Sequence, residues 1–140
     1  HHIPDYLSLI SLSIEILSPY GQFFSFQDPL RYNSVGLFSR KFSTIAYLSW
    51  RVLKGDIING LKRRIRRSKG IYLDDCPQDN AEYHVTRGGV DQEAIYELLK
   101  HSGFECEILR YFSTQSFVWQ LMGPALGIKN TFAIIARNVE

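Results

Sequence analysis

Hydrophobic residues at the start of the chain change from a helical to an extended spacing. From residue 5 to residue 17, apolar side chains recur every three or four positions and therefore share one helical face. They are Leu7, Ile10, Ile14 and Leu17. Pro4 and Asp5 suit the start of such a helix. The following segment, Gln22 to Phe26, is short and aromatic, so we expect a central strand that is covered on both faces.

A second helix is predicted to begin after Asp91, whose side chain can cap the first turn. The spacing of Ile95, Leu98 and Leu99 places them on the face of this helix that meets the core. Gly103 is typical of a left-handed residue that ends a helix.

Two further segments have the composition of strands. Phe104 to Phe112 alternates near its start, with Glu105 and Glu107 on one side and apolar side chains on the other, which predicts a partly exposed strand. Thr131 to Arg137 supplies another strand.

An insertion of about residues 29–90 separates the first strand from the Asp91 helix. Connections between a strand and the next helix usually have about two to six residues, and much longer ones often form lids or substrate-binding caps. We expect two helices in it, near Phe38 to Leu53 and from about Asp56 to Ser68, which Gly55 separates. The sequence therefore predicts a helical lid.

The second lid helix is predicted to be basic and amphipathic. Its apolar stripe consists of Ile57, Ile58, Leu61 and Ile65. Lysines and arginines occupy the other sides, so the helix can attract an anionic substrate or acidic lipid headgroups, with peripheral membrane contact. A solvated lid helix explains the same pattern. Nucleic acid is not expected, because aromatic residues do not interleave the basic run.

Composition narrows the class of protein to which this chain can belong. A chain of 140 residues that is 45% hydrophobic and 21% charged, with a net charge of +2, indicates a single globular domain over residues 1–140. Cys76 and Cys106 have no spacing that indicates a metal site or a disulfide framework. No signal peptide and no apolar run of roughly 20 residues is recognised, so we expect a cytoplasmic protein.

Three motifs carry a resemblance to a known family. They are His1-His2-Ile3-Pro4-Asp5, the turn Leu17-Ser18-Pro19-Tyr20-Gly21, and the last two predicted strands. In this order they resemble the second half of a class I S-adenosylmethionine-dependent methyltransferase, although the family commonly has glycine where this chain has Tyr20. The resemblance spans the chain outside the insertion.

The resemblance implies an α/β fold: the C-terminal half of a Rossmann-like methyltransferase fold with a mixed sheet, a final antiparallel hairpin and the inserted helical lid. The last strand would lie between the other two. The cofactor would be S-adenosylmethionine, and His1, His2 and Ile3 would lie beside its methionine part and the methyl group. The family's glycine-rich loop and ribose-binding acid would precede His1. We therefore expect an open sheet edge, covered by an N-terminal half or by a homodimer.

The implied activity is methyl transfer to a small-molecule or lipid-like acceptor, with this chain inactive by itself. The candidate bases are His2, then His1, and His84 on the return from the insertion, because histidine titrates near neutrality. Alternatively, one N-terminal histidine packs under the cofactor while the other bonds to a backbone carbonyl, and His84 is a solvated loop residue. A different function is also open: a non-catalytic module that binds a partner or a membrane.

Five further residues are candidates for binding the substrate. Asp28 and Arg31 follow the first strand, at the end of the sheet where open α/β folds bind ligands, although an ion pair or turn contact explains them equally. Tyr32, Tyr47 and Trp50 could form the walls of a pocket or simply the core of the lid.

Overall fold

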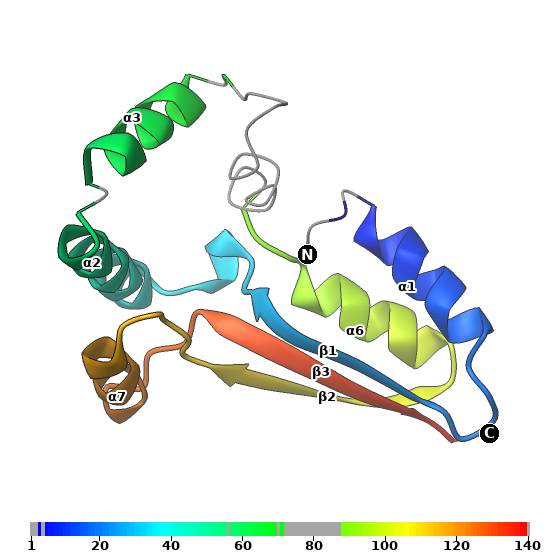
Figure 1. Cartoon of the computed structure of the whole chain (residues 1–140). Helices are drawn as coiled ribbons and strands as arrows, with labels where there is room; N and C mark the ends of the chain where they lie inside the picture. Colours follow the sequence, from blue (N-terminus) through cyan, green and yellow to red (C-terminus); the bar gives the residue numbers. More distant parts are fainter. Residues whose placement is uncertain (1–2, 4, 56, 70, 72–87, 140) are drawn as a thin grey trace.

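The computed structural model describes residues 3, 5–55, 57–69, 71 and 88–139. Helices and strands follow one another along the described chain as shown in Figure 1. They are α1 (Tyr6–Glu15), β1 (Gln22–Pro29), the 3₁₀ helix η1 (Tyr32–Ser34), α2 (Leu37–Leu53), α3 (Ile57–Ser68), α6 (Gln92–His101), β2 (Phe104–Tyr111), α7 (Phe117–Ala125) and β3 (Thr131–Asn138). Both helices predicted within the insertion and all three predicted strands are confirmed to within a few residues, whereas the lid role of the insertion stays a prediction.

The three described strands form one sheet in the order β1-β3-β2. β3 is antiparallel to both neighbours, with Phe23 opposite Ala136 and Glu105 opposite Arg137. β1 and β2 therefore run in the same direction, and the last strand lies between them, as expected. The described part of the chain is thus a mixed α/β fold with a three-stranded sheet.

One face of this sheet forms the main core with α1 and α6 (Figure 1). Ile95 and Leu99 of α6 are buried there against Phe132 and Ile134 of β3. The predicted inner face of α1 is also confirmed, since Ile10 is buried and its helical neighbours pack against the same cluster. Fully burying one such side chain stabilises a fold by about 1.5–3 kcal/mol.

Local signals set the bounds of α6. The Asp91 carboxylate accepts a hydrogen bond from the backbone N–H of Ala94 at 3.2 Å, as the predicted cap requires. Gly103 follows the helix with a φ of +85°, in the left-handed region that favours glycine. Tyr20 also has a left-handed φ, of +62°, at the position where the resembling family has glycine.

A second, smaller core joins α2 to α7 and to the end of β2. Phe42 packs edge-on against Phe112 and Trp119, with ring centroids 5.6 and 5.1 Å apart. Ala46 and Ile128 complete the cluster. α7 itself is a helix that the sequence pattern does not predict.

β1 lies at an edge of the sheet that the structure describes. The predicted central position of this strand and its coverage on both faces are not found among the described residues. Phe24 and Phe26 are 61% and 57% exposed, because α1 and α6 cover only the opposite face. The ring of Phe26 stacks on Phe24 and on Tyr111 of β2, forming an exposed aromatic row.

In Figure 1, α2 and α3 lie at the opposite end of the described structure from α1 and from the C-terminal end of β3. Arg51 of α2 lies close to Gly60 of α3, where an added Cβ would be 2.7 Å from its guanidinium. Among the described helices, none combines the length and the apolar character needed to cross a membrane.

Candidate functional site

A cavity of about 390 Å³ lies where the carboxyl ends of β1 and β2 meet α2. Strand β1 contributes Gln27, and α2 contributes Ser43, Tyr47 and Trp50. The remaining lining comes from the segment after β2 and from the start of β3. These residues are Phe112, Ser113, Thr114, Gln115, Asn130 and Thr131.

A bulge in β1 brings Gln27 to the cavity. The register between β1 and β3 shifts between Ser25 and Asp28, and Gln27 has a left-handed φ of +62°. Its backbone N–H donates to the Tyr111 hydroxyl at 3.1 Å. Non-glycine residues held in this conformation cost about 1–3 kcal/mol and cluster at functional sites. The bulge therefore sets the course of β1 at the rim of the cavity.

Two side-chain amides hold the loop after β2 that forms one wall. Asn130 accepts from the Ser113 N–H at 2.8 Å and donates to the Ser113 carbonyl at 2.9 Å. Gln120 accepts from the Thr114 N–H and donates to the Phe112 carbonyl, both at 2.9 Å. Each amide thus uses both its acceptor and its donor on the loop backbone. This wall is fixed before any ligand arrives.

The second core holds the α2 wall in place. The face of α2 that packs on α7 is anchored by Phe42, so the neighbouring positions Ser43, Tyr47 and Trp50 are held at the cavity. The Ser43 hydroxyl is buried and has no hydrogen-bond partner among the residues that the structure describes. A buried hydroxyl without a partner is costly, and a ligand atom in the cavity would satisfy it.

No described lining residue carries a charge at neutral pH. Cations lie instead over the two α2 rings that line the cavity, with the Arg51 guanidinium 4.9 Å from the Tyr47 ring and the Lys54 ammonium 5.1 Å from the Trp50 ring. These contacts orient the rings. The cavity can thus offer hydrogen bonds and aromatic surface, but no ion pair from its lining.

Burial raises the pKa of the Tyr111 phenol at the edge of this site. The hydrogen bond from the Gln27 backbone lowers this pKa, and the charge of Asp28 raises it again. Tyr111 is therefore protonated at neutral pH. In this neutral form the phenol oxygen accepts the hydrogen bond from the Gln27 backbone N–H.

The structure brings two of the five predicted substrate residues, Tyr47 and Trp50, into the cavity lining. It does not bring Asp28, Arg31 or Tyr32 there. Asp28 is buried and accepts a hydrogen bond from the Ser25 hydroxyl.

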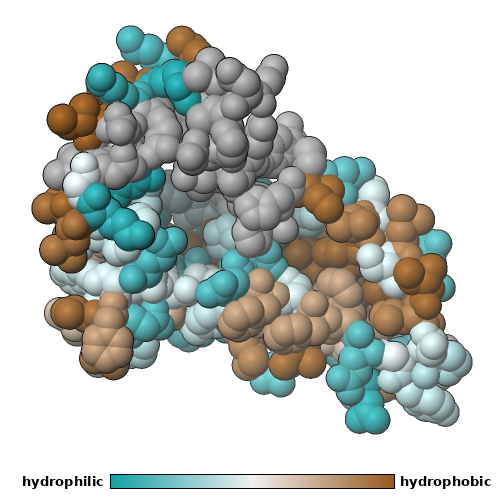
Figure 2. All heavy atoms as spheres, viewed as in Figure 1, coloured by the Kyte–Doolittle hydropathy of each residue, from teal (hydrophilic) through white to brown (hydrophobic). Residues whose placement is uncertain are grey.

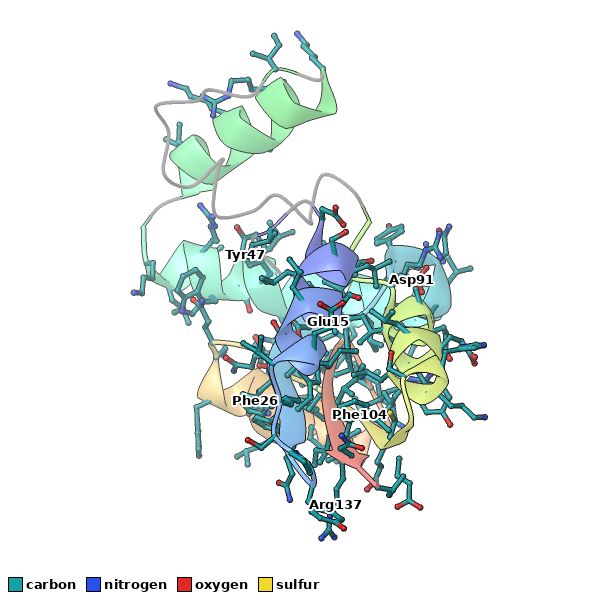
Figure 3. The ribbon with its side chains drawn as sticks, turned by 90° about the vertical axis from the view of Figure 1, so that its right-hand side faces the viewer. Glu15, Phe26, Tyr47, Asp91, Phe104 and Arg137 are labelled. Atoms are coloured by element: carbon teal, nitrogen blue, oxygen red, sulfur yellow. The ribbon has the colours of Figure 1, made fainter. Side chains whose placement is uncertain are left out.

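Arg31 and Tyr32 make contacts typical of structural residues. Arg31 forms an ion pair with Asp91 at the start of α6, where Figure 3 shows Asp91. The Arg40 guanidinium lies 4.5 Å from the ring centroid of Tyr32, which is 57% exposed. Arg31 also lines a second, more open pocket beside the start of α6. The proposed substrate roles of Arg31 and Tyr32 stay predictions.

The structure does not describe most of the residues that were predicted to act in catalysis or in cofactor binding. His1, His2 and His84 lie outside the described residues. Ile3 is described and is 43% exposed. Their roles stay predictions.

Several lining residues were not singled out from the sequence. The polar run Ser113-Thr114-Gln115, directly after a predicted strand, is a signal that could have pointed to the site. Gln27 carried no such signal, because a bulge depends on pairing with a distant strand. Comparison with protein-family models, with curated proteins and with solved structures finds no match for this chain, so the candidate site rests on geometry.

Proposed function

We propose that this chain is the C-terminal part of an S-adenosylmethionine-dependent methyltransferase domain and that the cavity holds the methyl acceptor. The strand order β1-β3-β2 carries the proposal, because a last strand antiparallel between two others is what the sequence resemblance implies. The place of the cavity, at the carboxyl ends of β1 and β2, gives further support, since open α/β folds bind ligands there.

The lining favours a small, neutral, polar acceptor over a lipid-like one. Its volume of about 390 Å³ suits a small molecule, and hydroxyl and amide side chains outnumber aromatic ones. An acyl chain would leave the buried Ser43 hydroxyl without a partner, at a cost in binding free energy. A hydroxylated ring that stacks on Tyr47 or Trp50 would satisfy both kinds of lining group.

The cofactor, when bound, supplies the methyl group. In this proposal Ile3 and the two N-terminal histidines contribute one wall of its site. The described residues contain no glycine-rich loop that joins a strand to a helix, so the chain cannot build a complete cofactor site from them. We assign that part to a complementary, cofactor-binding half of the domain.

The residues of this chain then act mainly on the acceptor. The amide-held loop and the α2 wall orient the attacking atom and exclude water, and such alignment is a large part of catalysis between two bound reactants. A base is needed where the attacking atom must lose a proton. His2 is the first candidate to accept that proton, followed by His1 and His84.

The complementary half is proposed to cover the open edge of β1 and the aromatic row beside it. Unpaired strand edges and contiguous exposed apolar surface are seldom left open in native proteins. Phe24 and Phe26 are both more than half exposed. A second copy of the chain is the alternative occupant, and light scattering after size exclusion separates the two, because only the second copy doubles the mass of the isolated chain.

The proposal is tested by calorimetric titration of S-adenosylhomocysteine into the full-length gene product that contains this chain. We expect micromolar binding. Tyr47→Ala and Trp50→Ala should leave this binding unchanged and raise the KM for a neutral hydroxylated acceptor by about tenfold. Phe117→Ala is the matched control, because Phe117 is 77% exposed on α7 and lies outside the cavity. Absence of cofactor-product binding by the full-length protein would overturn the proposal in favour of the non-catalytic module.

A further inference from the structure

Residues 37–69, which comprise α2, α3, their connection and Lys69 directly after α3, differ sharply in charge from the rest of the chain. We call this segment the basic arm. It contains ten of the sixteen lysines and arginines, and Asp56 is its one acidic residue. The other residues include six basic and thirteen acidic side chains. The small overall charge of +2 therefore conceals two regions of opposite sign.

α3 exposes an apolar stripe among these cations. Ile58, Leu61 and Ile65 are 70%, 56% and 49% exposed, at helical spacings that place them on one face. The sequence of α3 contains five basic residues and no acidic one. The stripe thus lies outside both described core clusters and presents apolar surface to solvent.

α2 continues the same arrangement. Its buried face consists of Phe42 and Ala46, and a different set of positions is exposed. Ile45, Leu48 and Val52 have the same helical spacing as the α3 stripe and are 53%, 45% and 57% exposed. Figure 2 shows hydrophobic and hydrophilic residues side by side along the margin formed by α2 and α3. The basic arm is therefore amphipathic along both helices.

We propose that the basic arm binds peripherally to membrane surfaces that contain anionic lipid, with the α3 stripe at the level of the headgroups. Apolar side chains flanked by lysine and arginine are what such a surface attracts, through apolar burial and through charge. The phosphates of a nucleic acid would pair with the lysines and arginines of the basic arm but would leave the apolar stripe of α3 exposed to water. A second basic arm would cover the stripe but bring like charges together. The proposal does not depend on methyl transfer.

The electrostatic part is tested by co-sedimentation of the 140-residue chain with phosphatidylcholine vesicles, with and without phosphatidylserine. We expect binding only with phosphatidylserine, weakened as NaCl rises from about 0.1 to about 0.5 M. Lys62→Gln with Lys69→Gln should lower the partition coefficient by about 25-fold, at about fivefold for each exposed cation. Lys100→Gln with Lys129→Gln removes the same charge outside the basic arm and should change it less than threefold.

The apolar part is tested by Leu61→Gln with Ile65→Gln, which should lower the partition coefficient about tenfold or more. Leu12→Gln with Ile16→Gln is the matched control, because Leu12 of α1 and Ile16, directly after α1, are 62% and 85% exposed outside the basic arm. All four side chains are exposed or half-exposed, so far-UV circular dichroism should be unchanged.

Three results would overturn the proposal. The first is equal loss of binding in each variant and its control. The second is equal binding to vesicles without phosphatidylserine. The third is preferential binding to double-stranded DNA or to a second copy of the chain that the Leu61→Gln and Ile65→Gln changes leave intact.

Discussion

Tyr111 links the bulge, the aromatic row and the rim of the cavity. Its hydroxyl accepts from Gln27, its ring stacks on Phe26 at 5.7 Å, and its carbonyl accepts from the Asn130 N–H at 3.0 Å. One side chain and its backbone thus connect all three strands at the end of the sheet where the cavity lies.

Burial raises the pKa of Tyr111, so the folded chain holds this phenolic proton to a higher pH than the unfolded chain does. The resulting contribution to stability is complete below the ordinary tyrosine pKa of about 10 and is lost as pH rises through the raised pKa. Tyr111→Phe should remove from the tyrosinate absorbance curve a component that titrates above the ordinary tyrosine pKa. It should also make the free energy of unfolding fall less steeply above about pH 10. Identical absorbance curves per tyrosine would contradict the assignment.

Gly123 of α7 meets the second core directly. A Cβ at this position would lie 2.1 Å from Cδ1 of the buried Phe112 ring. Gly123→Ala should therefore destabilise the chain by about 1–3 kcal/mol in urea unfolding, despite the higher helix propensity of alanine.

The matched control is Gly60→Ala in α3. There the nearest atom to an added Cβ is the Nη1 of Arg51, the end of a flexible side chain. Because that side chain can move, alanine should be neutral or stabilise by up to about 1 kcal/mol. Equal effects of the two substitutions would mean that contact with Phe112 does not limit residue 123.

At the scale of elements, Asp91 performs two separable tasks at the start of α6. One carboxylate oxygen caps the Ala94 N–H, and the other pairs with Arg31. Asp91→Ala removes both and should lower the free energy of unfolding by about 1–2 kcal/mol. Asp91→Asn keeps a good capping residue and should cost less than about 1 kcal/mol, because a partly exposed ion pair contributes little. Urea unfolding of both variants measures the difference, and an equal loss would show that capping by Asp91 contributes nothing.

Elements with local signals could be predicted from the sequence. α6 has a capping aspartate, a helical apolar face and a terminal glycine, and α1 has a helical apolar face beginning at a capping Asp5. β2 and β3 have strand composition, and their order in the sheet followed from the family resemblance. Such segments can be predicted because their capping residues, apolar spacing and terminal residues all favour the same element.

The features that form the candidate site could not be predicted in this way. The bulge at Gln27 exists only because β1 pairs with β3, more than a hundred residues later. α7 contains Gly123 and Pro124, which disfavour a helix, and it forms where its side chains pack on α2. The hydrogen bonds from the Asn130 and Gln120 side-chain amides to the loop after β2 are likewise tertiary contacts. Each depends on contacts that no local pattern encodes.

At the scale of the whole molecule, the described residues form two unlike exposed surfaces that suit different partners. The basic arm combines cations with exposed aliphatic side chains, whereas the sheet face opposite α1 and α6 has the aromatic row and apolar neighbours on β2 and β3. On that face Leu109 and Ile135 are 43% and 38% exposed. An anionic membrane suits the first surface and a packed protein element suits the second, so the two can be occupied together.

The sheet face yields a prediction that separates a contiguous patch from scattered apolar residues. Phe24→Gln with Phe26→Gln should lower the fluorescence of bound anilinonaphthalene sulfonate severalfold in the isolated chain, because the probe needs connected apolar surface. Leu12→Gln with Ile16→Gln removes exposed apolar area from α1 and should lower it much less. Since a proposed complementary half would cover this face, the full-length gene product should bind little of the probe with or without the phenylalanines. Strong probe binding by the full-length protein, abolished by the double phenylalanine change, would show that the aromatic row stays open and that nothing packs on it.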